Sequence, residues 1–135
     1  MEVITETIAN YWNPKKNHIM NIQFQSLHPF EKRVSLSSFI KDKYPGHVPV
    51  IIQKNPGSKL PNLPTFKFIF KDEATIGRVL STVRSSLRLP SEVAIFLFIG
   101  NTLPPVSSNL ASLYQKYPCE DGFLYITYEG EDTFG

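Results

Sequence analysis

The sequence predicts an α+β domain in which one mixed, four-stranded sheet wraps around a single amphipathic helix. Three observations support this fold class. Four segments carry residues typical of β-strands, at 48–52, 66–70, 93–99 and 123–128. One segment near residue 80 has apolar residues at helical spacing. Hydrophobic residues make up 41% of the 135 residues and charged residues 19%, which is the balance of a folded domain with a real core.

The amino-terminal part combines an arm with two helices. The arm, residues 1–21, shows no clean period. Residues 22–45 then predict a short helix and a longer one, separated by Pro29 and stopped by the Tyr-Pro-Gly sequence at 44–46. One face of the longer helix is expected to hold Phe30, Val34 and Ser37, with Leu36, Phe39 and Ile40 beside it.

The next two predicted strands form a hairpin. Residues 48–52 are rich in β-branched side chains, and Pro49 among them must occupy a place where no amide donor is needed. Residues 55–58, Asn-Pro-Gly-Ser, are typical of a turn. Alternation in the second strand places Phe66, Phe68 and Phe70 on one face and Lys67 and Ile69 on the other.

The rest of the chain predicts a helix, a strand, a helix and a strand. Thr75 is expected to cap a helix whose apolar stripe is Ile76, Val79, Leu80, Val83 and Leu87. Residues 93–99 lack a polar position, which predicts a strand covered on both faces. A short helix begins at Ser107 or Ser108, and a polar tail, 129–135, follows the last strand. After the leading helices, the order ββαβαβ is that of a ubiquitin-like β-grasp.

Composition excludes several classes of protein. The single Cys excludes a disulfide framework and a cysteine-rich zinc site. The longest apolar run, 93–99, is far shorter than the roughly 20 residues that span a bilayer, and residues 1–10 do not form a secretory signal. These features predict a cytoplasmic, single-domain protein. Residues 1–88 contain 13 of the 14 Lys and Arg residues. This distribution is compatible with two outcomes. The folded surface has a basic side and an acidic side, or folding brings basic and acidic residues together and mixes the charges.

No pattern of catalytic residues is present. His18, His28 and His47 lack the spacing of metal ligands, so neither a metal nor a cofactor is expected. Cys119 is followed by Glu120 and Asp121, whose negative charge disfavours a thiolate. The glycines form no phosphate-binding loop, and the net charge of +2 is too small to indicate nucleic acid. We therefore expect a binding protein rather than an enzyme.

Six motifs, in order from about residue 22 to the end, resemble a known family. They are His-Pro-Phe-Glu-Lys-Arg at 28–33, Lys-Tyr-Pro at 43–45 with Val-Pro-Val-Ile at 48–51, the approach to Lys67 and Phe68, Asn-Thr-Leu-Pro-Pro at 101–105, Glu-Asp-Gly-Phe-Leu-Tyr at 120–125 and Thr-Phe-Gly at 133–135. The chain resembles the autophagy-related ubiquitin-like modifiers, the group of GABARAP and microtubule-associated protein light chain three. This resemblance implies a ubiquitin-like domain, residues 22–135, with two additional amino-terminal helices.

The resemblance implies conjugation through the carboxyl-terminal glycine. Gly135 matches the residue that the family couples to phosphatidylethanolamine on autophagosomal membranes. Lacking a Cβ, a glycine leaves its activated acyl group open to attack. The implied partners are E1-like and E2-like conjugation enzymes, a processing and deconjugating cysteine protease, and the membrane. The implied location is the cytoplasm, and the autophagosome membrane after lipidation.

The resemblance also implies binding of aromatic-x-x-aliphatic peptides from receptors and adaptors, by addition of a strand to a sheet edge. The aromatic pocket matches Ile40, Pro49, Ile51, Lys67, Ile69 and Phe123. The aliphatic pocket matches Phe68, Phe70, Lys71, Ala74, Val79, Thr82 and Val83. In the aromatic pocket, Leu36 replaces the family's acidic residue, so a carboxylate acceptor for a Trp indole N–H is absent at that position. In the aliphatic pocket, Lys71, Ala74, Val79 and Thr82 replace the family's usual Pro, Leu, Phe and Leu. These four replacements predict a second pocket that is shallower at some positions, larger at others and more polar.

Two alternatives and one question about the arm stay open at this stage. In the first alternative the same modifier serves a membrane outside autophagy, and in the second the chain is a non-conjugated module, for instance on microtubules. In the arm, Trp12 either docks on the protein's own surface or belongs to a loosely packed segment.

Overall fold

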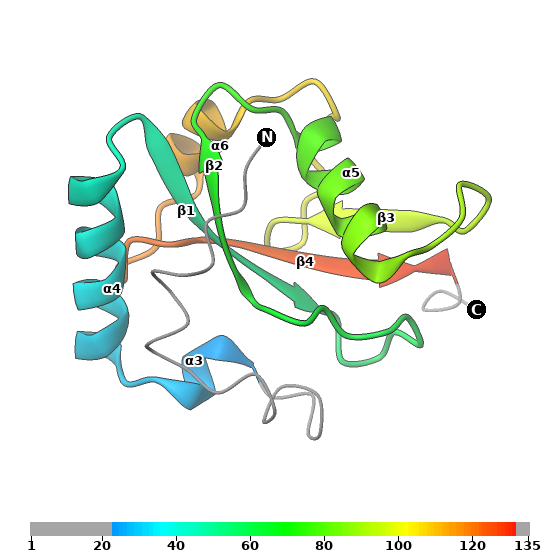
Figure 1. Cartoon of the computed structure of the whole chain (residues 1–135), viewed down its shortest axis with the longest axis horizontal. Helices are drawn as coiled ribbons and strands as arrows, with labels where there is room; N and C mark the ends of the chain where they lie inside the picture. Colours follow the sequence, from blue (N-terminus) through cyan, green and yellow to red (C-terminus); the bar gives the residue numbers. More distant parts are fainter. Residues whose placement is uncertain (1–22, 132–135) are drawn as a thin grey trace.

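The computed structural model describes residues 23–131, which form a four-stranded mixed sheet with helices on both faces (Figure 1). The strand order is β2-β1-β4-β3. Strand β1 is antiparallel to β2 and parallel to β4, and β3 is antiparallel to β4. The bounds are β1 (His47–Lys54), β2 (Lys67–Lys71), β3 (Ile95–Phe98) and β4 (Leu124–Gly130). The predicted hairpin and mixed sheet are confirmed.

The helices divide between the two faces of the sheet. They are α3 (Phe24–Leu27), α4 (Phe30–Lys43), α5 (Ile76–Leu87) and α6 (Leu110–Lys116). Helix α5 packs against one face, where its apolar stripe joins the main core of the domain. Helices α3 and α4 contribute Phe24, Leu36 and Ile40 to a smaller set of buried residues on the other face. The central helix and the two leading helices are therefore as predicted. None of the helices in residues 23–131 is long and apolar enough to cross a bilayer.

The ladder between β1 and β2 explains how Pro49 fits into a strand. Ile52 N donates to Phe66 O, and Asp72 N donates to Gly46 O, both at 2.9 Å. Antiparallel pairs alternate between bonded and non-bonded positions, so Pro49, opposite Ile69, is at a non-bonded position. The Pro49 nitrogen is directed away from β2. On the side of β4, pairing begins only at the next residue, Val50. The missing donor therefore costs the sheet no hydrogen bond.

The ends of α5 follow the sequence signals. The Thr75 side chain accepts a hydrogen bond from Arg78 N, as an N-cap should. At the other end, Arg88 takes the left-handed conformation with φ 57°, and its backbone N–H caps the carbonyls of Arg84 and Ser85. The capped helix begins and ends where its apolar stripe does.

Several predicted details are wrong. Helix α6 begins after Asn109, not at Ser107 or Ser108, because the Asn109 side chain accepts from Ser112 N. Strand β4 continues to Gly130, since its last residues pair with β3. Strand β3 is buried on one face only. Phe96 and Phe98 are half-buried because the residues of α3 and α4 cover β1, β2 and β4 but not β3.

The inward face of α4 also differs from the prediction. Its buried residues are Leu36, Ser37 and Ile40, whereas Phe30 and Phe39 are 43% and 39% exposed. The guanidinium of Arg33 lies 5.7 Å from the centre of the Phe30 ring. Such cation–π contacts stabilise an aromatic ring at the surface without burying it.

Candidate functional site

The residues matched to the aromatic pocket come together on the sheet face that α3 and α4 cover. Four of them, Ile40, Ile51, Ile69 and Phe123, are fully buried in one apolar cluster. Pro49 and Lys67 are buried as well. This cluster, called the second cluster below, also contains Phe24, Leu36 and Phe66. The sequence places Leu36 at the aromatic pocket, in the position of an acidic residue, but it does not predict Phe24 and Phe66 as site residues.

Phe24, from α3, occupies the centre of the second cluster. Its ring lies 5.3 Å from that of Phe123 and 6.2 Å from that of Phe66, in edge-to-face geometry. Its backbone N–H donates to Gln53 Oε1 at 2.7 Å, which attaches α3 to β1. Phe66, just before β2, leaves the predicted face of Phe68 and Phe70 and packs here instead. The prediction for Phe66 is wrong because strand alternation does not apply before the strand begins.

Burial alters the electrostatics beside Phe24. The Lys67 ammonium lies 5.4 Å from the centre of the Phe24 ring, and burial lowers the pKa of Lys67 from 10.5 to about 7. Burial and, to a smaller extent, the charges of Lys67, Lys32 and Arg33 together lower the pKa of His28 from 6.5 to about 4. His28 is thus neutral at pH 7, and the site carries less positive charge than its sequence suggests.

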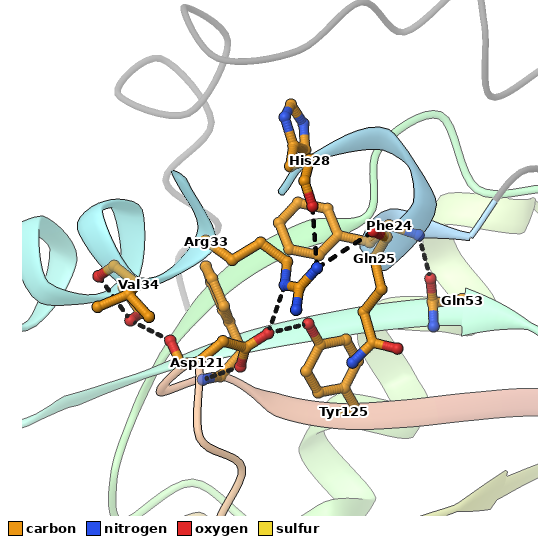
Figure 2. A network of polar contacts seen from close by, with 10 residues as sticks. Phe24, Gln25, His28, Arg33, Val34, Gln53, Asp121 and Tyr125 are labelled. Atoms are coloured by element: carbon orange, nitrogen blue, oxygen red, sulfur yellow. Dashed lines mark hydrogen bonds and ion pairs between the residues drawn. The ribbon is translucent and has the colours of Figure 1, made fainter. Parts of the chain in front are cut away.

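A buried polar network joins the leading helices to the sheet (Figure 2). Arg33 Nε donates to Asp121 Oδ2 at 3.0 Å, and its Nη1 donates to the carbonyls of Gln25 and His28. The Asp121 side chain is 1% exposed and also accepts from Phe123 N and from the Tyr125 hydroxyl. Arg33 therefore holds α3 in place over the second cluster.

The residues matched to the aliphatic pocket divide between core and surface. Phe68, Phe70, Val79 and Val83 are buried in the main core, and Ala74 packs against it. Thr82 is half-buried, and its hydroxyl donates to Arg78 O at 3.1 Å. Lys71 is exposed at the end of β2. The large apolar members therefore belong to the core and do not line a surface pocket.

An open pocket of about 350 Å³ lies at the start of α5. It is lined by Lys71, Glu73, Ala74, Thr75 and Arg78. Lys71 and Ala74 belong to the predicted aliphatic pocket, and the other three were missed. The sequence predicts a polar second pocket from Lys71 and Thr82. It does not predict the charged side chains of Glu73 and Arg78 there, because only the turn between β2 and α5 brings them beside Lys71.

Strand β2 connects the two sides of the site. It is the terminal strand of the sheet. Since Phe66 and Asp72 bond to β1, alternation directs the backbone groups of Ile69 and Lys71 toward the outer edge. The second cluster lies on one side of this edge, and the pocket at α5 lies on the other.

The described residues offer no catalytic constellation. In residues 23–131 no group of three or more His, Cys, Asp or Glu side chains is placed to hold a metal ion. Burial is the main cause that raises the pKa of the Cys119 thiol, so the nucleophilic thiolate is disfavoured. Gly135 and Trp12, which the sequence singled out, are outside the described residues.

Comparison with known proteins agrees with this fold. Residues 32–135 match a family model described as "Autophagy protein Atg8 ubiquitin like". "Autophagy-related protein 8" of Pichia angusta is 41% identical over 116 residues, which is 86% of this chain and 93% of the relative. "Autophagy-related protein 8c" of Arabidopsis thaliana is 42% identical over 115 residues, 85% of this chain and 97% of the relative. The crystal structure of Trypanosoma brucei ATG8 superposes with a TM-score of 0.79 at 35% identity, covering 84% of this chain and 98% of that one.

Proposed function

Because this chain belongs to the Atg8 family of ubiquitin-like autophagy proteins, we propose that it is a modifier conjugated through Gly135 to phosphatidylethanolamine. The family match that extends through Gly135 is the observation that carries this proposal. In conjugation, the lipid amine attacks the Gly135 carbonyl held as an enzyme thioester, so that an amide forms as the thioester breaks and the enzyme thiol leaves. Two acyl chains then anchor a domain firmly, whereas one gives only marginal binding. E1-like and E2-like enzymes supply the activated glycine, and the chain itself is not an enzyme.

The second part of the proposal is that the β2 edge binds aromatic-x-x-aliphatic peptides. A peptide strand added there bonds to the outward backbone groups of Ile69 and Lys71. Residues three apart in a strand point to opposite faces, so the two anchor side chains reach opposite sides of the sheet. The second cluster is on one side and the pocket at α5 on the other. Lipid attachment and peptide binding together would recruit receptors to autophagosomal membranes.

Reconstitution tests the conjugation. The chain is incubated with purified family E1-like and E2-like enzymes, ATP and liposomes that contain phosphatidylethanolamine. We expect a lipidated product that disappears in Gly135→Ala and in liposomes of phosphatidylcholine alone. Product formed equally by Gly135→Ala would contradict conjugation through this residue. Membrane localisation in cells that is unaffected by the same substitution would favour the non-conjugated module.

A further inference from the structure

The pocket at the start of α5 combines a mainly apolar lining surface with two cationic side chains. Its lining side chains are two cations, one carboxylate, one threonine and one alanine. The large apolar residues behind it are closed off, since Phe68, Phe70 and Val79 are at most 2% exposed. An aliphatic side chain would therefore meet the Ala74 methyl and the stems of Lys71 and Arg78 rather than an apolar floor. Such stems pack against methylene groups while their charged ends stay in water.

The two cations of this pocket are available to a ligand. Lys71 and Arg78 are exposed. Across residues 23–131 the ion pair present joins Arg33 to Asp121, so neither cation is paired with Glu73. The pocket has a formal charge of +1, with two donors of charge-assisted hydrogen bonds. A carboxylate that enters the pocket is attracted by Lys71 and Arg78 and repelled by Glu73.

Backbone donors at the start of α5 are already in use. Ile76 N donates to Ser108 O and Gly77 N donates to Val106 O, both at 2.9 Å. Arg78 N donates to Thr75 Oγ1 at 3.3 Å. Recognition of an anion at this place therefore depends on the side chains of Lys71 and Arg78, which substitution can remove without disturbing the helix cap.

We propose that the second anchor of the peptides bound by this chain is acidic, with glutamate preferred, giving an aromatic-x-x-Glu motif. This inference rests on the proposed peptide binding at the β2 edge: it keeps the aromatic first anchor and replaces the aliphatic second anchor with an acidic one. Glutamate has two methylenes to pack along the stems and a carboxylate that reaches both cations. Its neutral isostere, glutamine, fills the same space without the charge, and leucine supplies apolar volume only.

Titration of three peptides tests this proposal. The peptides are identical except for the fourth residue of Trp-x-x-Glu, Trp-x-x-Gln and Trp-x-x-Leu, and binding to the full chain is followed by fluorescence anisotropy at low salt. We expect the Glu peptide to bind about tenfold more tightly than the Gln peptide, since two exposed ion pairs form. The preference should shrink as salt screens the charges.

Matched variants assign the preference to this pocket. Lys71→Gln and Arg78→Gln should each reduce the Glu preference, and the double variant should remove it. Glu73→Gln should strengthen Glu-peptide binding. Lys59→Gln removes the same charge from the loop at the opposite end of β2 and should change the preference less than twofold.

Three results would overturn the inference. If the Leu peptide binds more tightly than the Glu peptide, the anchor is aliphatic and peptide binding at the edge still stands. If the Glu preference persists in the double variant, the anion binds elsewhere. If all three peptides bind no better than controls with Ala in place of Trp, the proposed peptide binding fails, and the acidic anchor with it.

Discussion

Arg33 of α4 and Asp121, just before β4, form a buried ion pair with 3.0 Å between Nε and Oδ2. These residues are separated by 87 others in the chain, and their side chains are 14% and 1% exposed. The same guanidinium donates to the carbonyl of Gln25, within α3, and to that of His28, the C-cap of α3. One side chain therefore connects both leading helices to the ubiquitin-like sheet.

Removing one partner of this pair should destabilise the domain strongly. Arg33→Met leaves the buried Asp121 carboxylate without its cation, and we expect the free energy of unfolding to fall by about 3–5 kcal/mol. Chemical denaturation measures the change. Lys32→Met, at an exposed position of the same helix, should have an effect within about 0.5 kcal/mol. Equal effects of the two substitutions would contradict a structural role of the pair.

Gly122 should tolerate no side chain, in contrast to Gly57. Gly122 has φ +88°, and a Cβ there would lie 2.4 Å from the Ser37 hydroxyl oxygen. At Gly57 the nearest atom would be 3.5 Å away. We expect Gly122→Ala to cost at least about 1–2 kcal/mol of stability and Gly57→Ala to cost far less. Thermal melts of the two variants decide this, and similar melting temperatures would refute the strain at Gly122.

Stability should rise with pH above neutrality because of Lys67. Its pKa is about 7 in the folded chain and 10.5 when unfolded, so the unfolded state binds more protons between these values. The free energy of unfolding should therefore increase from pH 7 to pH 9, below the range where tyrosines ionise. In Lys67→Met the increase should be smaller. An identical pH dependence in both proteins would mean that Lys67 keeps its ordinary pKa.

Acid should weaken the fold through His28. Folding lowers its pKa from 6.5 to about 4, mainly by burial, so the unfolded state binds the extra proton in this interval. Stability should fall as pH drops from 6.5 to 4. His28→Gln should show a shallower fall in denaturation experiments. NMR titration gives a direct check, and a His28 pKa near 6.5 in the folded protein would exclude this contribution.

Much of the fold is predictable from local pattern. The stripe of α5 and its Thr75 cap are readable because both depend on neighbouring residues. The order of helices and strands along the chain then leaves few ways to arrange the four strands in one sheet. The starting point of α6 was misplaced because Ser107, Ser108 and Asn109 are all acceptable caps, and only the structure shows which side chain accepts a hydrogen bond.

The site depends more on contacts distant in sequence. Phe24 and Phe66 join the second cluster through tertiary packing. Neither strand nor helix periodicity predicts that these two residues pack there. The sequence does not reveal Asp121 as a buried ion-pair partner, because Arg33 lies far away in the chain. The pocket at α5 was only partly predicted, because a turn brings Glu73 and Arg78 beside Lys71.

Activation of Gly135 by a purified family E1-like enzyme tests conjugation through this residue most directly. With ATP, we expect an enzyme adduct that is cleaved by thiol reductants, because the Gly135 carboxyl is held as a thioester. Deletion of Gly135 should abolish the adduct without altering the melting temperature. An adduct that persists after the deletion would contradict conjugation through Gly135, as would failure of the intact chain to be charged where a family relative is charged.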